Sequence, residues 1–390
     1  MIYELKKIFS GFLAKLSVIL LIVLVFAFSV FAFSTYESGD GTYKGKAGFN
    51  YEASLEEKYE GEINSHLIEA FIDSADLSGG KDKSVASVYT KFPSLSTTIL
   101  DAYKPLLQGG NGKAFENLLE TRGSDFYDRN VINIKSMLDE RLNTTMSEKE
   151  KAMVIERASK IEKPYKFEYF GEWNLIYDVF SVIILISFII IIFQISSIYS
   201  VEAENSMEIL LRSLGGNQVR KIIYRKIAAT FALVTSEVLL VSLIFTLVSF
   251  YYTGLRGFNA PVQLFYFNSI YNYSFGQTYI LIILGFLLGS LAIAMMTFLI
   301  NRFAKRSFQA FILGLAALLL PKLLGFIIVN NNIFLKILRS MPINLIQIGE
   351  ILKSLYLGLF GNLQIFSIYL LSIFIIILTS LVLVLKERKL

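Results

Sequence analysis

Apolar residues along this chain gather in six long runs that are separated by polar segments. The runs cover residues 16–34, 176–199, 227–252, 278–300, 308–329 and 363–385. Each reaches or approaches the roughly 20 residues that a helix needs to cross about 30 Å of hydrocarbon. The pattern therefore predicts an all-α polytopic membrane protein with six transmembrane helices, and a chain that is 54% hydrophobic agrees with it.

Lysine and arginine in the short connecting segments predict the orientation of the chain. They form four clusters: Lys6, Lys7 and Lys15; Arg212, Arg220, Lys221, Arg225 and Lys226; Arg302, Lys305 and Arg306; Lys386, Arg388 and Lys389. Under strict alternation of the spans all four clusters fall on one side, and short cytoplasmic loops are enriched in these residues. We therefore expect a multi-pass protein of the cell membrane with both termini in the cytoplasm. Its Ile-, Lys- and Asn-rich composition is typical of a low-GC bacterium.

Three regions follow from this topology. Residues 1–34 comprise an N-terminal interfacial helix and the first transmembrane helix, 35–175 an extracellular domain, and 176–390 the other five transmembrane helices. The middle region holds 18 Lys and Arg against 24 Asp and Glu, a balance of −6, while the whole chain carries +5. Ser147 and Glu150 have the spacing of a helix capping box. A polar segment of about 140 residues can bury a core, so we expect a mainly helical inserted domain.

Two segments allow alternative interpretations. The first apolar run could be the core of a cleaved signal peptide, with Ala32 and Ser34 at the cleavage site, but it exceeds the roughly 7 to 15 residues typical of such a core. Residues 330–362 are expected to form an external hairpin, and Glu350 and Lys353 interrupt its apolar part. It is either a re-entrant hairpin that protein shields from lipid or a helix lying on the outer surface.

The residue types present exclude several kinds of chemistry. The chain has no Cys and one His, His66, so the usual metal sites and nucleophilic pairs cannot be assembled. Residues 77–81, LSGGK, are close to the signature of ABC ATPases, but no GxxxxGK[ST] phosphate-binding loop accompanies them. We predict no catalytic, cofactor-binding or metal-binding residue and no enzymatic activity. Basic residues scattered between apolar runs also argue against a nucleic-acid partner.

Two ionisable residues fall inside predicted spans. Glu237 lies about ten residues into the third run, and Lys322 follows Pro321 in the fifth. A charge at mid-bilayer costs at least ~2.5 kcal/mol on insertion scales, so it must be paired, hydrated or neutralised. One hypothesis is an ion pair on a translocation path, because the two depths differ by only about 6 Å. The other is that Glu237 is a structural hydrogen-bonding group and that Lys322 extends to the outer interface.

Two further patterns concern packing. Gly285 and Gly289 form a GxxxG in the fourth run, which allows another helix to approach closely. The external segment 256–275 is rich in Phe and Tyr, a composition suited to the headgroup region of a membrane.

The segment 200–226, between the second and third runs, combines an apolar face with regularly spaced charges. Its apolar positions follow the spacing i, i+3, i+4, i+7: Met207, Leu210, Leu211 and Leu214. Its charged positions step by four: Glu204, Glu208 and Arg212. Gly215 and Gly216 can end this helix and Asn217 can cap a second one, whose basic residues reach the anionic headgroups. We predict a short helix, a turn and an elbow; a solvated amphipathic loop is the alternative.

This segment resembles the cytoplasmic coupling segment of the permease subunits of type-2 ABC exporters. The matching residues are Glu202 or Glu204, Met207 to Leu211, Arg220 and Lys226. The six spans and the hairpin before the last one also agree, so the resemblance covers most of the chain except residues 35–175. The turn departs from the usual Pro-containing form. Its Gly-Gly version is nearer to FtsX/MacB-type permeases, which have a large external domain but four spans.

The resemblance implies a permease subunit without cofactors of its own. Two such chains, identical or paralogous, would assemble with two copies of a separate ABC ATPase that binds ATP and Mg. The residues that would contact the ATPase are Glu204, Met207, Glu208, Leu211, Arg212 and Gly215. An amphipathic peptide or a lipid-like antimicrobial is the expected substrate. The alternatives are an FtsX/MacB-like permease that signals to an extracellular partner without transport, and a membrane-anchored interaction protein without an ATPase.

Overall fold

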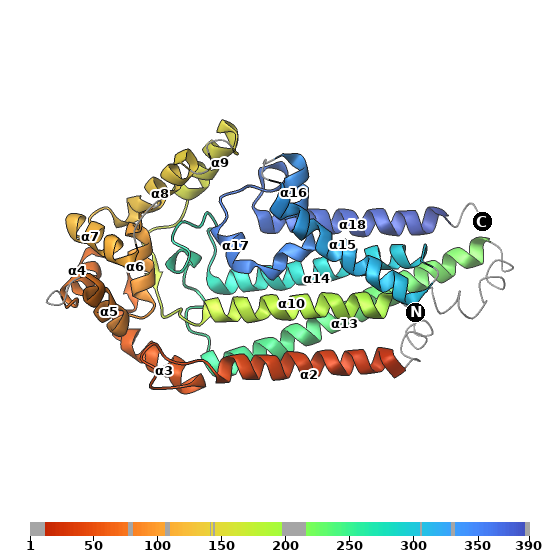
Figure 1. Cartoon of the computed structure of the whole chain (residues 1–390), viewed down its shortest axis with the longest axis horizontal. Coiled ribbons are helices and arrows are strands. Elements are labelled where there is room, and N and C mark those ends of the chain that lie inside the picture. The colour runs from red at the N-terminus through yellow and green to blue at the C-terminus, as the bar shows by residue number, and fades with distance from the viewer. Residues whose placement is uncertain are drawn as a thin grey trace.

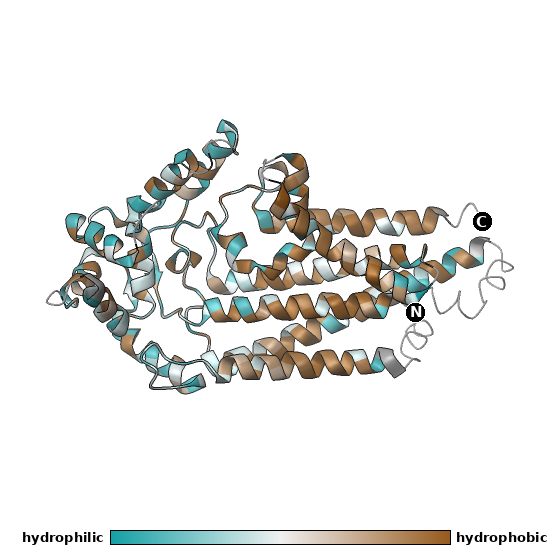
Figure 2. Ribbon diagram, viewed as in Figure 1, coloured by the Kyte–Doolittle hydropathy of each residue, from teal (hydrophilic) through white to brown (hydrophobic). Residues whose placement is uncertain are grey.

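The six expected spans are present as helices. The structure is a computed structural model and describes residues 12–76, 81–105, 110–140, 142, 145–196, 216–304, 306–328 and 332–386. Within these residues six helices are long and apolar enough to cross a membrane: α2 Phe12–Ser34, α10 Trp173–Ile195, α13 Gly216–Thr253, α14 Phe275–Asn301, α15 Ser307–Ile327 and α18 Gln364–Lys386. They form one elongated bundle that is apolar along its length (Figures 1 and 2). The chain is an all-α, multi-pass membrane protein.

Helix α14 occupies a central position in the bundle. It packs against α10, α13, α15 and α18, while α2 packs on α13 and α10. Helices α2, α15 and α18 turn leucine, isoleucine and phenylalanine side chains outward, among them Phe26, Phe326 and Phe374, each more than half exposed. Such apolar outer faces are the surfaces that lipid covers in a membrane protein.

Helix α13 begins where the second helix of the predicted elbow was expected. It starts at Gly216, within the Gly-Gly pair, and continues as one helix to Thr253, while the first helix and the turn of the predicted elbow lie outside the described residues. At about 1.5 Å per residue it is about 57 Å long, nearly twice the hydrocarbon thickness. Its first turns project past the ends of α2 and α10 (Figure 1). Lys221 and Arg225 are exposed there, but Lys226 is only 1% exposed and packs into protein, so it does not face headgroups as expected.

Residues between α2 and α10 form a helical lobe at one end of the bundle (Figure 1). Its elements are α3 Gly45–Glu56, η1 Glu57–Tyr59, β1 Gly61–Glu62, α4 Ser65–Asp73, α5 Lys81–Lys91, α6 Leu95–Tyr103, α7 Asn111–Thr121, α8 Phe126–Glu140, α9 Glu148–Ser159 and β2 Lys166–Phe167. The two short strands pair antiparallel, with Gly61 opposite Phe167. Phe71, Phe92 and Phe115 are buried between the helices. The predicted mainly helical domain and the Ser147–Glu150 capping box are confirmed, and His66 is exposed.

A buried carboxyl group begins helix α6. Glu56, the last residue of α3, is fully buried and accepts hydrogen bonds from the backbone N–H groups of Ser94 at 3.1 Å and Leu95 at 2.8 Å. The first N–H groups of a helix have no partner within the helix, so this contact satisfies donors that would otherwise be orphaned. Burial nevertheless raises the pKa of Glu56 to about 7, because loss of water costs the anion more than these bonds return.

Replacing Glu56 with Gln should therefore reduce the pH dependence of stability. The ordinary pKa of the group is 4.5 and the folded value is about 7. Folded protein binds the proton more tightly, so the contribution of this group is greatest below pH 4.5 and is lost as pH rises to 7. Between these two limits the contribution of Glu56 to the free energy of unfolding changes by roughly 3 kcal/mol. Thermal unfolding of wild type and Glu56→Gln at pH 5 and pH 7.5 measures this change, and an equal dependence of stability on pH in the two proteins would contradict the assignment.

A hairpin of short helices separates α15 from α18. It comprises α16 Ile333–Arg339, η4 Pro342–Ile346, α17 Ile348–Lys353 and η5 Leu359–Gly361. The element η4 packs against α10, α14 and α15. A Cβ atom on Gly289, at the middle of α14, would lie 3.1 Å from Cβ of Pro342. One on Gly285 would lie 3.0 Å from the ring of Tyr369 on α18 and 3.2 Å from Leu345 of the hairpin.

The GxxxG of α14 thus accommodates the hairpin. With η4 against the middle of a span and enclosed by three helices, the arrangement favours a re-entrant hairpin over a helix lying on the surface. Protein shields its irregular backbone from lipid, as such a segment requires at membrane depth.

Enlarging Gly289 should displace the hairpin. Gly289→Leu would push side-chain atoms into Pro342, and overpacking of this kind costs typically about 1–3 kcal/mol. Gly325→Leu is the matched control, because no heavy atom lies within 4 Å of a Cβ built on Gly325. We expect a melting temperature several degrees lower in detergent for Gly289→Leu and little change for the control. Equal melting temperatures for the two variants would exclude the close packing described above.

Candidate functional site

Glu237 is the one carboxylate that α13 carries into the bundle. Its side chain is only 4% exposed. Among the described residues, none donates a well-formed hydrogen bond to either of its carboxyl oxygens. Gln194 of α10 lies beside it and is the polar group that interacts with it. Gln194 in turn donates to the hydroxyl of Ser17 on α2 at 3.2 Å.

These contacts place Glu237 away from the middle of the bundle. Gln194 is the next-to-last residue of α10, and Ser17 lies in the second turn of α2. Asn301, the last residue of α14, donates to the carbonyl of Ile195 at 3.2 Å and belongs to the same level. Glu237 is therefore part of a buried polar layer near the end opposite the lobe, closer to that end than the expected mid-bilayer position.

Lys322 lies in the other half of the bundle, on the hairpin side. Its ammonium group donates to Oδ1 of Asn344 at 3.3 Å and to Oε1 of Gln347. The amide nitrogen of Asn344 donates to carbonyls of the hairpin itself, Leu338 at 2.8 Å and Met341 at 3.1 Å, which leaves its oxygen for the lysine. Glu237 and Lys322 are both in the described part of the chain, and no ion pair joins them. The proposed pairing does not form, and Lys322 instead fastens α15 to the hairpin.

A cavity of about 360 Å³ adjoins Lys322. Lys322, Arg339 and Lys353 line it together with one acid, Glu350, and several amide side chains. The guanidinium of Arg339 stacks over the ring of Tyr356 at 4.0 Å, while its Nη1 is buried and donates no hydrogen bond to any of the described residues. The lining has an excess of positive charge, so it can accommodate an anionic group.

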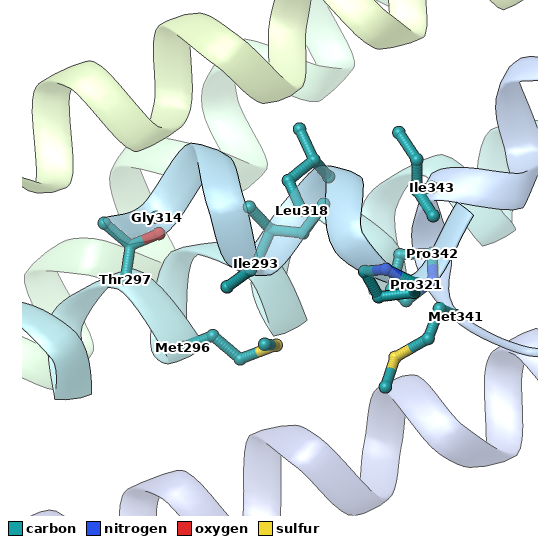
Figure 3. Close-up of a pocket in the computed structure, with 10 residues that line it drawn as sticks. Ile293, Met296, Thr297, Gly314, Leu318, Pro321, Met341, Pro342 and Ile343 are labelled. Carbon is teal, nitrogen blue, oxygen red and sulfur yellow. The ribbon is translucent and has the colours of Figure 1, made fainter. Parts of the chain in front are cut away.

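Pro321 marks a second, much smaller gap between α14, α15 and the hairpin. Figure 3 shows Pro321 of α15 beside Pro342 of the hairpin, Leu318 beside Ile293 of α14, and Thr297 at the other end of the gap beside Gly314. The volume is about 20 Å³, which is enough for little more than one water molecule. A proline inside a helix removes one backbone hydrogen bond. The gap is therefore a local packing discontinuity beside the hairpin and too small for a substrate.

The lobe is fixed to the bundle through the aromatic loop between α13 and α14. Thr98 of α6 donates to the carbonyl of Leu264, in η3 Val262–Leu264, at 2.5 Å, and Asn130 of α8 donates to that of Phe267 at 2.5 Å. The rings of the loop are mostly buried against lobe and bundle: Tyr266, Phe267, Tyr271 and Phe275. They hold two parts of the protein together, in place of the predicted contact with headgroups.

Helix α9 makes a second connection between the lobe and the bundle, this time to the hairpin. Lys336 of α16 pairs with Glu150 of α9, and Arg157 donates to the carbonyl of Gly361 at 3.3 Å. Partial burial of Glu150 raises its pKa, but the bonds from Lys336 and from the N–H of Ser147 outweigh this and hold the pKa below its ordinary value. The carboxylate is thus ionised at neutral pH and the pair is fully formed.

Helix α13 makes a third connection. Arg256, just after α13, donates to the side chain of Asn50 in α3 at 3.0 Å, and the Trp173 indole of α10 donates to the carbonyl of Arg256 at 2.9 Å. Phe33 of α2 contacts Phe49 of α3 as well as Phe245 of α13. Helix α3 of the lobe therefore contacts both α2 and α13.

The predicted ATPase-contacting residues are not placed. Glu204, Met207, Glu208, Leu211, Arg212 and Gly215 all lie outside the described residues, as does the N-terminal stretch 1–11. The structure fixes only where their segment attaches, at the start of α13. Within the described residues no group of His, Cys, Asp and Glu is arranged to hold a metal ion.

Searches against protein families, curated proteins and solved structures gave no match for this chain. Its function must therefore be argued from its own residues.

Sequence reasoning identified Glu237 and Lys322 but missed their partners. Gln194 stands near the end of an apolar run, and the amides of Asn344 and Gln347 stand in a segment without clear periodicity. The signal that could have revealed them is the presence of uncharged polar side chains in otherwise apolar segments.

Neutralising Glu237 should be tolerated. A buried carboxylate without a cationic partner destabilises the fold, so Glu237→Gln, which keeps the shape, should leave the melting temperature unchanged or raise it by a few degrees. Gln194→Glu places a second carboxyl group beside that of Glu237 and should lower the melting temperature by several degrees. Thermal unfolding in detergent at pH 7.5 checks both, and a large loss for Glu237→Gln would show instead that an ionised carboxylate is required.

Proposed function

We propose that this chain is the permease subunit of an ATP-driven ABC exporter in the cell membrane. The observation that carries the proposal is helix α13, which begins at the coupling segment predicted from the sequence and ends at the lobe. Because α13 is one continuous helix of 38 residues, we expect it to move as a rigid rod. Displacement of its first turns by a partner would be transmitted along the bundle.

The distribution of charge supports the orientation. Lys15, Arg220, Lys221, Arg225, Arg302 and Arg306 all lie at the end of the bundle opposite the lobe. Because basic residues are enriched on the cytoplasmic side of membrane proteins, this supports an orientation with that end inside the cell and the lobe outside. The segment 200–215 then faces the cytoplasm, where an ATPase subunit could bind it.

The assembly we propose contains two permease chains and two ATPase subunits. ATP and Mg would bind only the ATPase, because this chain has no phosphate-binding loop. Rearrangement of the ATPases would bias the packing of α10 and α13 between two states. The cargo would be an amphipathic peptide or a lipid-like antimicrobial, which the cell exports or resists.

A second function is favoured by the three attachments of the lobe. The aromatic loop, the Lys336–Glu150 pair and the Arg256–Asn50 contact couple the lobe to α13, α14 and the hairpin. A permease of the FtsX/MacB type could use the same coupling to reshape the lobe and to signal to an extracellular partner without moving a substrate.

The coupling assignment is tested with the combined substitution Glu208→Ala and Arg212→Glu. It removes one predicted ATPase contact and reverses the charge of the other, so association with the proposed ABC ATPase subunit should fall at least tenfold. Stimulation of ATP turnover by the reconstituted permease should be lost. Co-purification and phosphate release measure the two effects.

Glu156→Ala with Lys160→Glu is the matched control. These residues form an exposed i, i+4 ion pair on α9, with the same spacing and the same chemistry as Glu208 and Arg212. Association that survives in both double variants would refute the coupling assignment. Uptake of labelled peptide by inverted vesicles separates the two functions, because a purely signalling permease hydrolyses ATP through its partner without flux.

A further inference from the structure

A cavity of about 540 Å³ lies where the lobe meets the bundle. Its wall comes from the loop after α2, from α3, from α5, from the start of α6 and from the residues just before α10, and Phe265 of the aromatic loop completes it. A volume of this size is within the range of small-molecule binding sites, about 300–1,000 Å³. The site therefore joins elements of the lobe to the segments that adjoin α2 and α10 and to the loop between α13 and α14.

Aromatic rings make up much of the wall. They are Tyr36, Tyr51, Tyr89, Phe170 and Phe265. The faces of such rings carry partial negative charge and attract cations, most strongly where water is excluded. Phe170 is buried, whereas Tyr51 and Tyr89 are half-buried.

Carboxylates stand at both the floor and the mouth. Glu52, on the floor, is 6% exposed and accepts hydrogen bonds from Tyr36 Oη at 2.6 Å, Tyr169 Oη at 3.0 Å and the N–H of Gly39 at 2.7 Å. Three donors of this kind stabilise an anion in a buried position. Tyr36 remains a neutral donor, because burial and the neighbouring Glu52 raise its pKa.

Asp40 is exposed at the mouth. It accepts hydrogen bonds from the Ser38 hydroxyl at 2.6 Å and from the N–H of Thr42 at 3.0 Å, and these bonds hold its pKa well below the usual range. Among the described residues that line the cavity none is Lys, Arg or His. Glu172 lies behind the floor, where burial raises its pKa well above the ordinary value and keeps it neutral, so the negative charge is concentrated at Glu52 and Asp40.

We propose that this cavity binds an organic cation, with an ammonium or guanidinium group directed to Glu52 and an apolar body held between the aromatic rings. The two requirements, charge and apolar surface, match the two parts of the lining. A neutral or anionic molecule of the same shape lacks the attraction to both carboxylates, and an inorganic cation lacks the apolar body. The proposal concerns binding by this chain alone and does not depend on an ATPase partner.

Binding is measured by calorimetry on the full chain in nanodiscs of uncharged lipid. The probes are phenethylammonium, the neutral 2-phenylethanol and the anionic phenylpropionate, which share a ring and differ in charge. We expect saturable binding of the cation, and at least tenfold weaker binding of the other two. Octylammonium and an amidated Lys-Phe dipeptide then distinguish a lipid-like amine from a peptide as the source of the cation.

Two variants locate the binding in the cavity. Glu52→Gln removes the floor charge, and Ala86→Trp fills the mouth from an exposed position on α5 without touching a hydrogen bond of the floor. Both substitutions should weaken the binding of phenethylammonium at least tenfold. Lys83→Trp, at an exposed position of the same helix that does not line the cavity, should bind the cation like wild type.

Three results would overturn the proposal. They are no saturable binding of any of the cations, equal affinity for phenethylammonium and its neutral analogue, and unchanged affinity in Ala86→Trp. Because Ala86→Trp leaves the bonds of Glu52 intact, it decides the matter even if Glu52→Gln fails to fold.

Discussion

The close contact between the hairpin and the glycine face of α14 is the constraint on which the bundle depends. Irregular backbone cannot face lipid, so the segment 341–346 must be enclosed by protein. Gly285 and Gly289 provide the space for it, and α10 and α15 cover its other sides. Lys322 then completes the enclosure by donating to Asn344 and Gln347, which is why a charged residue is retained inside α15.

The hairpin also carries part of the lobe. Through the Lys336–Glu150 pair and the bond from Arg157 to Gly361, the position of α9 depends on the position of the hairpin. The aromatic loop and Arg256 make the same link to α13 and α14. A change in the packing of the membrane helices would therefore reach the lobe at several points at once. This property suits an exporter that gates its pathway and equally a permease that signals outward.

The aromatic and acidic cavity lies on that mechanical connection. Tyr36 follows α2, Phe170 precedes α10, and Phe265 follows α13, while Glu52 belongs to the lobe. An occupant would contact segments that move with different helices, and a ligand that binds one arrangement better shifts the equilibrium toward it. The cavity is thus in a position to relate the presence of a cation to the state of the bundle.

The six spans, the helices between the first two of them and the start of α13 could all be predicted from the sequence. These follow from hydrophobic runs, a capping box and a Gly-Gly pair, which are local features that each segment expresses without its neighbours. Glu237 and Lys322 could also be identified, because a charged residue within an apolar run is recognisable from the sequence alone.

The contacts of these residues depend on how the helices pack and could not be predicted. Glu237 meets Gln194 and Lys322 meets the hairpin, since tilt and packing, which leave no mark in the order of residues, set their depths. The role of the aromatic loop changed for the same reason. A run of Phe and Tyr is equally compatible with headgroups and with a protein core, and the choice is made by whether another part of the chain covers it. The cavity is lined by residues that lie more than 200 positions apart in the sequence, from Tyr36 to Phe265, so no local pattern could predict it.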